Sequence, residues 1–147
     1  MTTWENDLTV GVRFMDDEHA GLHASLIDFG ALVEAPLPTT ASHIVRTTRA
    51  TGIQLRLHRL RLELSAHFTH KEQIMYAYDY PGTSEHTAAH ATFLGELDGM
   101  SIRYATGDDA IPARVVSFVH IWFARHSTHS DLQLSDWLLQ HHPHVSI

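Results

Sequence analysis

The stretch SHIVRTTRATGIQLRLHRLRLELSAHFTHKEQIMYAY, residues 42–78, decides the fold. Its apolar residues follow a helical pattern, which indicates a long helical segment. Because glycine weakens a helix, Gly52 leaves open whether the first ten residues belong to the same helix. The apolar residues that carry the pattern are Ile44, Ile53, Leu55, Leu57, Leu60, Leu62, Leu64, Phe68, Ile74 and Met75.

An arm and a first helix precede this segment. Residues 4–16, WENDLTVGVRFMD, lack a helical period, so we expect an extended arm that Trp4, Val10 and Val12 anchor onto the core. A helix then starts at Asp17. It ends before APLPTT, because proline cannot continue a helix. The apolar positions of this helix are Leu22, Leu26, Ile27, Phe29, Gly30 and Val33.

Two more helices follow the long segment. The turn DYPGTSEH ends the segment, and Thr83 or Ser84 is the expected cap of a helix that runs to about residue 105. After TGDDAIP we expect Asp109 to cap a last helix, from residue 113 to about 139, with Pro112 in its first turn. Four helices, short turns and no strand pattern predict an all-α, up-down antiparallel four-helix bundle with an extended N-terminal arm.

Size and composition limit the classes of function. The chain has 147 residues, which suits a single domain over 1–147, and 44% of them are apolar. A net charge of −7 with ten Lys and Arg residues offers no basic stripe for nucleic acid. The absence of cysteine removes disulfides and thiolate metal sites. With no signal sequence and no apolar run of about 18 residues, we expect a cytoplasmic protein outside the membrane.

The fourteen histidines are the unusual feature of the composition. Positions four residues apart on a helix project from nearly the same side. Each of the four expected helices carries a histidine with a second histidine or a carboxylate four or five residues away. Inward polar groups from four helices are costly unless a metal satisfies them, and histidine with carboxylate suits iron or manganese, with zinc as a competitor. These groups are His19 and His23, Glu63 and His67, His86 and His90, and His126 with Asp131.

Four motifs, taken together, resemble those of the bacterial hemerythrins over almost the whole chain. They are VGVRFMDDEH ending at His19 with Trp4 before it, HF and Met75 of HFTHKEQIM, YPGTSEHTAAH with His86 and His90, and WFARHSTHSD with His126 and Asp131. The resemblance implies a four-helix bundle with two irons that bind dioxygen. It implies one iron on His86, His90 and His126, a second on His19 and His67, and Asp131 as a bridge.

Two features of the sequence bear on whether such an iron site can form. His126 and Asp131 are separated by about 140° on a regular helix, so the family's geometry requires a local bulge or a bend there. The place of the second bridging carboxylate, four residues after His67, is taken by Lys71. A protonated amine has no lone pair, so it cannot bridge two irons and would repel both.

Three arrangements could compensate for Lys71. A π-bulge could turn Glu72 inward. One iron could remain on His86, His90, His126 and Asp131, with Lys71 paired to Asp131. A displaced set of His19, His23, Glu63 and His67 could hold a metal one turn away, unless His23 and Glu63 only hydrogen-bond each other in support of the ligands. In a regular helix, His70 and Glu72 are expected to be solvated.

The leading functional hypothesis is a non-haem iron protein, with two ions or one, that binds dioxygen or another small oxidant. Leu26, Phe93, Trp122 and Phe123 would form the dry wall of its pocket. One alternative is an iron enzyme that reduces peroxide, oxygen or nitric oxide, with Lys71 as proton donor or electrostatic stabiliser. Another is a metal-dependent sensing module. No catalytic triad or phosphate loop supports hydrolytic chemistry.

Overall fold

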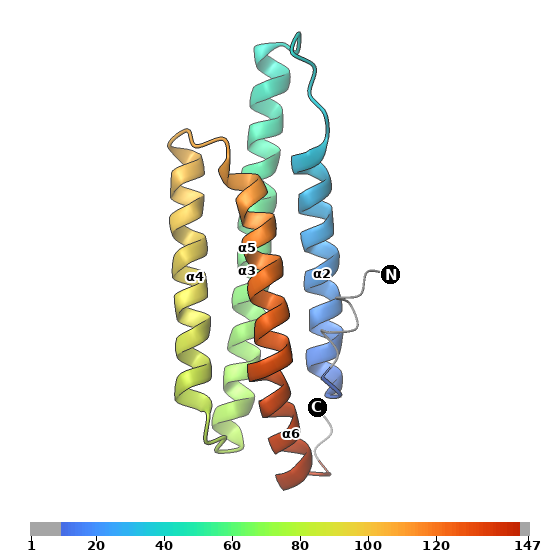
Figure 1. Ribbon diagram of the computed structural model, residues 1–147, viewed down its shortest axis with the longest axis vertical. Coiled ribbons are helices and arrows are strands. Elements are labelled where there is room, and N and C mark those ends of the chain that lie inside the picture. Colours follow the sequence, from blue (N-terminus) through green and yellow to red (C-terminus); the bar gives the residue numbers. More distant parts are fainter. Residues whose placement is uncertain (1–9, 145–147) are drawn as a thin grey trace.

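Four helical rods form an up-down antiparallel bundle in the computed structural model, which describes residues 10–144 (Figure 1). The rods α2, α3, α4 and α5 pack as a closed ring, in which α2 contacts both α3 and α5 and α4 contacts the same two helices. No strand occurs within residues 10–144, which confirms the predicted all-α class. The elements are α2 (Arg13–Glu34), α3 (His43–Ala77), α4 (Thr83–Ala105), α5 (Ile111–His126), η1 (Ser127–Asp131) and α6 (Leu132–His141).

The arm is shorter than expected, because α2 begins at Arg13 rather than at Asp17. The carboxylate of Asp16 accepts hydrogen bonds from the backbone N–H groups of Val10 (2.7 Å) and Gly11, which ties the arm to the first turn of α2. Val10 and Val12 are buried, as expected of anchors. Trp4 lies outside the described residues.

The α3 helix is continuous over 35 residues, so Gly52 does not break it. At 1.5 Å per residue it is about 52 Å long, and its first turns project beyond the neighbouring helices (Figure 1). Ile53 and Leu57, directly after Gly52, are buried and hold this part of α3 against the bundle. Three members of the apolar pattern face outward instead, namely Ile44, Leu55 and Leu62.

The predicted helix caps at α4 and α5 are wrong. The N-cap of α4 is Gly82, and the Thr83 hydroxyl donates to the Tyr80 carbonyl instead of capping the helix. The α5 helix begins at Ile111 with no side-chain cap, although Pro112 lies in its first turn as predicted. Each turn satisfies its own backbone groups locally, which sequence spacing does not reveal.

A polar layer divides the apolar core into two clusters. The larger, upper cluster extends from Leu22 to Phe29 on α2 and from Ile111 to Phe123 on α5. The smaller, lower cluster joins the arm to the ends of α3 and α6, and consists of Val10, Val12, Met15, Ile74, Met75, Leu134 and Leu138. The histidines predicted from sequence lie between the two clusters, where their burial has to be compensated.

Candidate metal centre

Seven buried polar side chains from all four rods make up this layer. They come from α2, α3, α4 and the junction of α5 with η1, and none is more than 6% exposed. Six of them form two groups of candidate ligands, and within each group the ligand atoms lie within 4.8 Å of one another; the seventh is Lys71. The first group, the upper triad, is His86, His90 and His126, and the second, the lower triad, is His19, His67 and Asp131.

The upper triad brings three imidazole Nε2 atoms together. The Nε2 of His126 lies 2.9 Å from that of His86 and 3.1 Å from that of His90. Burial lowers the pKa of all three rings, for His126 to about 4, so the rings are neutral near pH 7. Neutral imidazoles have lone pairs, and three nitrogens that face one another suit a shared cation.

His90 is held in place by Glu72 and Phe68. Its Nδ1 donates to Glu72 Oε1 at 2.8 Å, which leaves the Nε2 lone pair directed at the triad. The ring stacks on Phe68 with centroids 4.0 Å apart. The expectation that Glu72 is solvated is therefore wrong, since it reaches from α3 to α4 and supports a candidate ligand.

The π-helical segment η1 brings Asp131 into the layer. The predicted bulge between His126 and Asp131 is confirmed by η1, in which five residues complete a turn and return Asp131 to the face of His126. Asp131 Oδ1 lies 3.2 Å from His126 Nε2 and 3.1 Å from His86 Nε2. Its other oxygen, Oδ2, lies 3.2 Å from His19 Nε2, so this carboxylate touches both triads.

The lower triad contains a buried nitrogen that the described residues leave unsatisfied. His67 Nε2 has no hydrogen-bond partner within residues 10–144, while its Nδ1 lies 3.5 Å from Glu18 Oε2. Burial and the charge of Lys71 lower the pKa of His67 to about 4, so this ring also carries a lone pair near pH 7. Glu18 also accepts a hydrogen bond from exposed His70, which is therefore not simply solvated, whereas the contact of Glu18 with His67 is only a 3.5 Å approach.

Lys71 lies fully buried within the layer. Its Nζ donates to Asp131 Oδ1 at 2.6 Å, and both side chains are 0% exposed. Burial lowers the pKa of Lys71, and the adjacent carboxylate opposes this shift. Burial alone raises the pKa of Asp131, but the Lys71 charge and hydrogen bonds from the histidine rings hold it well below its usual range. The π-bulge that was one of the three possible arrangements around Lys71 is absent, because α3 is regular there.

The structure separates the other two candidate ligands from these triads. His23 is buried beside a small apolar cavity that Leu26 and Phe123 also line. Glu63 lines a different, open cavity with Glu18 and His67. Neither His23 nor Glu63 belongs to the two groups of ligand atoms found among the described residues. Metal ligation by the displaced set therefore stays a prediction.

The donor set of the upper triad fits a metal ion. Two nitrogens that bind one ion at about 2.1 Å and at right angles are about 3.0 Å apart, close to the separations observed here. The three neutral imidazoles and one carboxylate are the ligand types that iron, manganese and zinc share. The orphaned Nε2 of His67 indicates that the lower triad also offers a donor towards a cation.

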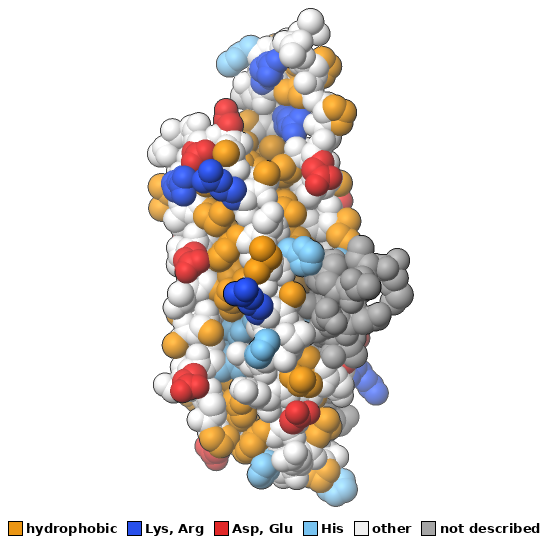
Figure 2. Space-filling view, viewed as in Figure 1, with side chains coloured by type: hydrophobic (Ala, Val, Ile, Leu, Met, Phe, Trp, Pro, Cys, Tyr) orange, Lys and Arg blue, Asp and Glu red, His pale blue; other side chains and the backbone are white. Residues whose placement is uncertain are grey.

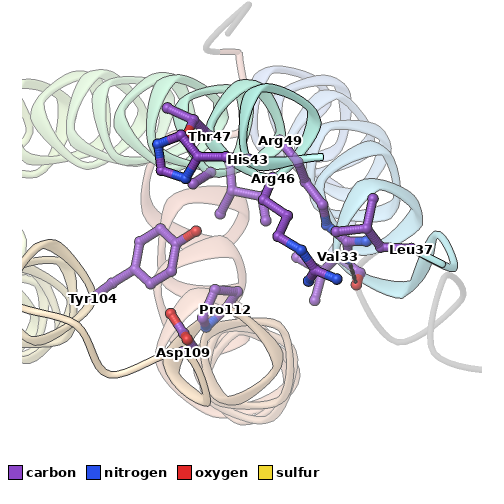
Figure 3. A pocket seen from close by; sticks show the side chains of 11 residues that line it. Val33, Leu37, His43, Arg46, Thr47, Arg49, Tyr104, Asp109 and Pro112 are labelled. Atoms are coloured by element: carbon purple, nitrogen blue, oxygen red, sulfur yellow. Dashed lines mark hydrogen bonds between the residues drawn. The ribbon is translucent and has the colours of Figure 1, made fainter. Parts of the chain in front are cut away.

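A further cavity, at the opposite end of the bundle, has a structural role. It measures about 470 Å³, and Figure 3 shows His43 and Arg46 of α3 across from Tyr104 and Asp109. Arg46 donates to the carbonyls of Pro38 and Thr39, while Arg49 donates to the carbonyl of Val33. These arginines therefore hold the connection between α2 and α3.

The surface adds no concentrated charge on the face shown. Figure 2 shows acidic and basic side chains scattered over it, with apolar side chains between them. Among the helices of residues 10–144, none combines the length and apolar character needed to cross a bilayer.

Comparisons with known proteins agree with this geometry. The family model of the hemerythrin HHE cation binding domain matches residues 10–142. A bacteriohemerythrin of Ralstonia nicotianae is 32% identical over 77 residues, which cover 52% of this chain and 56% of that protein. A hemerythrin of Themiste dyscrita is 27% identical over 95 residues, 65% of this chain and 67% of that protein. No solved structure gives a significant match. The chain belongs to the hemerythrin HHE cation binding domain family.

Proposed function

We propose that this protein is a non-haem iron protein that binds dioxygen or a related small oxidant in the bundle core. The observation that carries the proposal is the convergence of three neutral imidazole Nε2 atoms and the Asp131 carboxylate in one buried layer. The names of the relatives, bacteriohemerythrin and hemerythrin, support the same class of protein. Manganese and zinc are the competing metals.

The roles of the residues follow from their contacts. His86, His90, His126 and Asp131 would hold iron, which when bound supplies a redox-active centre for a small oxidant. Glu72 keeps the Nε2 lone pair of His90 on the inner side of its ring. His19 and His67 lie across Asp131 from this set and are the candidate ligands of a second ion.

The surroundings of the layer suit a small apolar ligand. Phe123 lies edge-on to His19, with ring centroids 5.0 Å apart, and borders an apolar cavity of about 10 Å³ with Leu26. On the other side Trp122 stacks on His126 at 4.3 Å and contacts Phe93. These aromatic side chains border the layer with apolar surface on two sides.

Metal analysis with spectroscopy tests this proposal. Metal-free protein is reconstituted anaerobically with ferrous iron, desalted and analysed for iron, and its absorption is then followed as dioxygen is added and removed. We expect retained iron and a reversible change in absorption. His90→Ala should lose the iron, whereas His58→Ala, an exposed histidine of α3, should keep it. The proposal is contradicted if the wild-type protein retains no iron. It is also contradicted if the absorption of the bound iron does not change when a small oxidant is added.

A second candidate function is the reduction of peroxide, oxygen or nitric oxide. The buried ammonium of Lys71 beside Asp131 favours it, because a positive charge in the layer would stabilise negative charge that develops on an oxidant. Rapid consumption of peroxide by the iron-loaded protein would support this function. A stable and reversible response to dioxygen would support binding instead.

A further inference from the structure

We propose that Lys71 is a built-in cation that takes the place of a second metal ion, so that the layer holds one ion, on the upper triad. This inference rests on the proposed function and determines the number of ions at the same site. It selects one of the arrangements that the sequence leaves open.

The first support is the position of Lys71 on α3. Lys71 lies four residues after His67 in a regular helix, so both side chains project into the layer from the same face. Lys71 is 0% exposed, and no bulge brings the neighbouring Glu72 into its place. Glu72 instead points towards α4, where it accepts a hydrogen bond from His90. Among residues 10–144, Asp131 is therefore the carboxylate that lies between the two triads.

The second support is the way in which Asp131 is shared. Asp131 Oδ1 accepts from Lys71 Nζ at 2.6 Å, which is shorter than its contacts with the two histidines of the upper triad. A contact this short between an amine and a carboxylate is typical of a charge-assisted hydrogen bond. The ammonium thus neutralises the carboxylate at the point where two metal ions would share it. A second divalent ion on the other side would lie beside the ammonium and would find the negative charge of the carboxylate already compensated.

The two triads are also unequal in what they offer. The upper triad has three imidazoles whose Nε2 atoms already converge, and Glu72 orients one of them. The lower triad has two imidazoles, and its third member is the carboxylate that Lys71 neutralises. The side with three converging imidazoles is the side that binds the ion, while His19 remains in contact with Asp131.

A single ion changes the chemistry available in the layer. Two ferrous ions can together give two electrons to one oxidant, whereas one ferrous ion gives one. With Lys71 in place, the layer is suited to binding or to one-electron steps at one ion. The chain would therefore differ in its chemistry from an oxygen carrier with two irons, although both have the same four-helix bundle.

The experiment counts metal ions in the intact chain. Wild-type protein, Lys71→Glu and Lys71→Met are each loaded with ferrous iron, oxidised and analysed for iron per chain and by electron paramagnetic resonance. Arg59→Glu, an exposed change on α3 with the same net charge as Lys71→Glu, is the matched control. We expect one ion with the signal of isolated ferric iron in wild type and Arg59→Glu. In Lys71→Glu we expect two ions and loss of that signal through coupling.

The outcomes distinguish this inference from the function on which it rests. Two coupled ions in the wild type overturn the inference and leave the proposed iron protein intact. No bound ion in the wild type overturns the proposed function itself. A folded Lys71→Glu variant that still binds one ion overturns the role of Lys71. Lys71→Met, which removes the charge at similar length, decides this point if the glutamate variant does not fold.

A separate measurement uses the fact that Lys71 is the only lysine in the chain. In protein labelled with ¹⁵N-lysine and loaded with diamagnetic zinc, the single side-chain nitrogen reports whether it is an ammonium. We expect one slowly exchanging signal coupled to three protons, absent from Lys71→Met. A nitrogen coupled to two protons would mean that Lys71 is a neutral amine, which overturns the inference in the wild-type protein without any variant.

Discussion

At the scale of single residues, neighbours in the chain serve the layer in different ways. Lys71 points from α3 into the layer and pairs with Asp131. Glu72 points towards α4 and accepts a hydrogen bond from Nδ1 of His90. A turn of 100° between consecutive positions produces this division. Exchanging the order of these two residues would reverse the sign of the charge inside the layer.

Glu72→Ala is expected to weaken metal binding about tenfold to a hundredfold, because an outer carboxylate fixes the tautomer and the orientation of a ligating histidine. Competition with a chromophoric chelator, using zinc, measures the affinity. Glu96→Ala, which removes an exposed carboxylate of α4, is the control and should leave the affinity unchanged. Equal affinities of the two variants would show that Glu72 has no such role.

The sequence predicted the side chains of the layer and, as one of three arrangements, the pairing of Lys71 with Asp131, but not the contact that holds His90. His86 and His90 could be paired because both lie on one helix, where the repeat fixes their relative direction. The partnership of Glu72 with His90 joins two helices, and it depends on their rotation and separation, which spacing within either helix does not determine. Burial of Lys71 was predictable from its distance to His67, while its bond to Asp131 required η1.

At the scale of elements, α3 stays helical at a glycine, whereas η1 leaves α-helical geometry without a glycine or proline. The α3 helix continues through Gly52, where a break was considered, because buried residues follow it directly. The η1 segment departs from α-helical geometry although no glycine or proline requires it. The bulge was inferred only because Asp131 had to reach the histidines, so its prediction came from the resemblance rather than from helix propensity.

Gly52→Ala should stabilise the protein by up to about 1 kcal/mol, because alanine is the better helix former. A methyl group at this position would meet Leu32 at 3.8 Å, an ordinary contact. Gly107→Ala is the contrasting variant and should destabilise, since Gly107 has a φ of +110°. Urea unfolding measures both. A lower free energy of unfolding for Gly52→Ala would indicate that this part of α3 needs the flexibility of glycine.

At the scale of the whole molecule, the polar layer separates two apolar clusters and crosses all four rods. The bundle itself was predictable, because four apolar patterns and short turns leave few other arrangements. The division of its core was not, since the pattern assigns residues to an inner face without saying at which level they meet. Only the folded chain shows that Met15, Ile74 and Leu134 lie on the far side of the layer from Leu22.

Metal binding should stabilise the whole bundle, because the ion joins residues of α4 to the junction of α5 and η1. At a free metal concentration 100 times the Kd, the free energy of unfolding rises by about 2.7 kcal/mol. In a chain of this size that raises Tm by roughly 8 °C. Thermal unfolding of the wild type with zinc, with a chelator, and of His126→Ala measures the effect. Equal midpoints with zinc and with the chelator would contradict it.

The division of the core also bears on how an ion could reach a buried layer. The lower cluster is built from the arm and from the terminal turns of α3 and α6, so it contains much less apolar packing than the upper one. Local opening costs least where packing is sparse. Amide hydrogens around this cluster should therefore exchange with solvent faster than those of the upper bundle. Loading and release would then proceed by transient loosening at this end, while the rest of the protein stays folded.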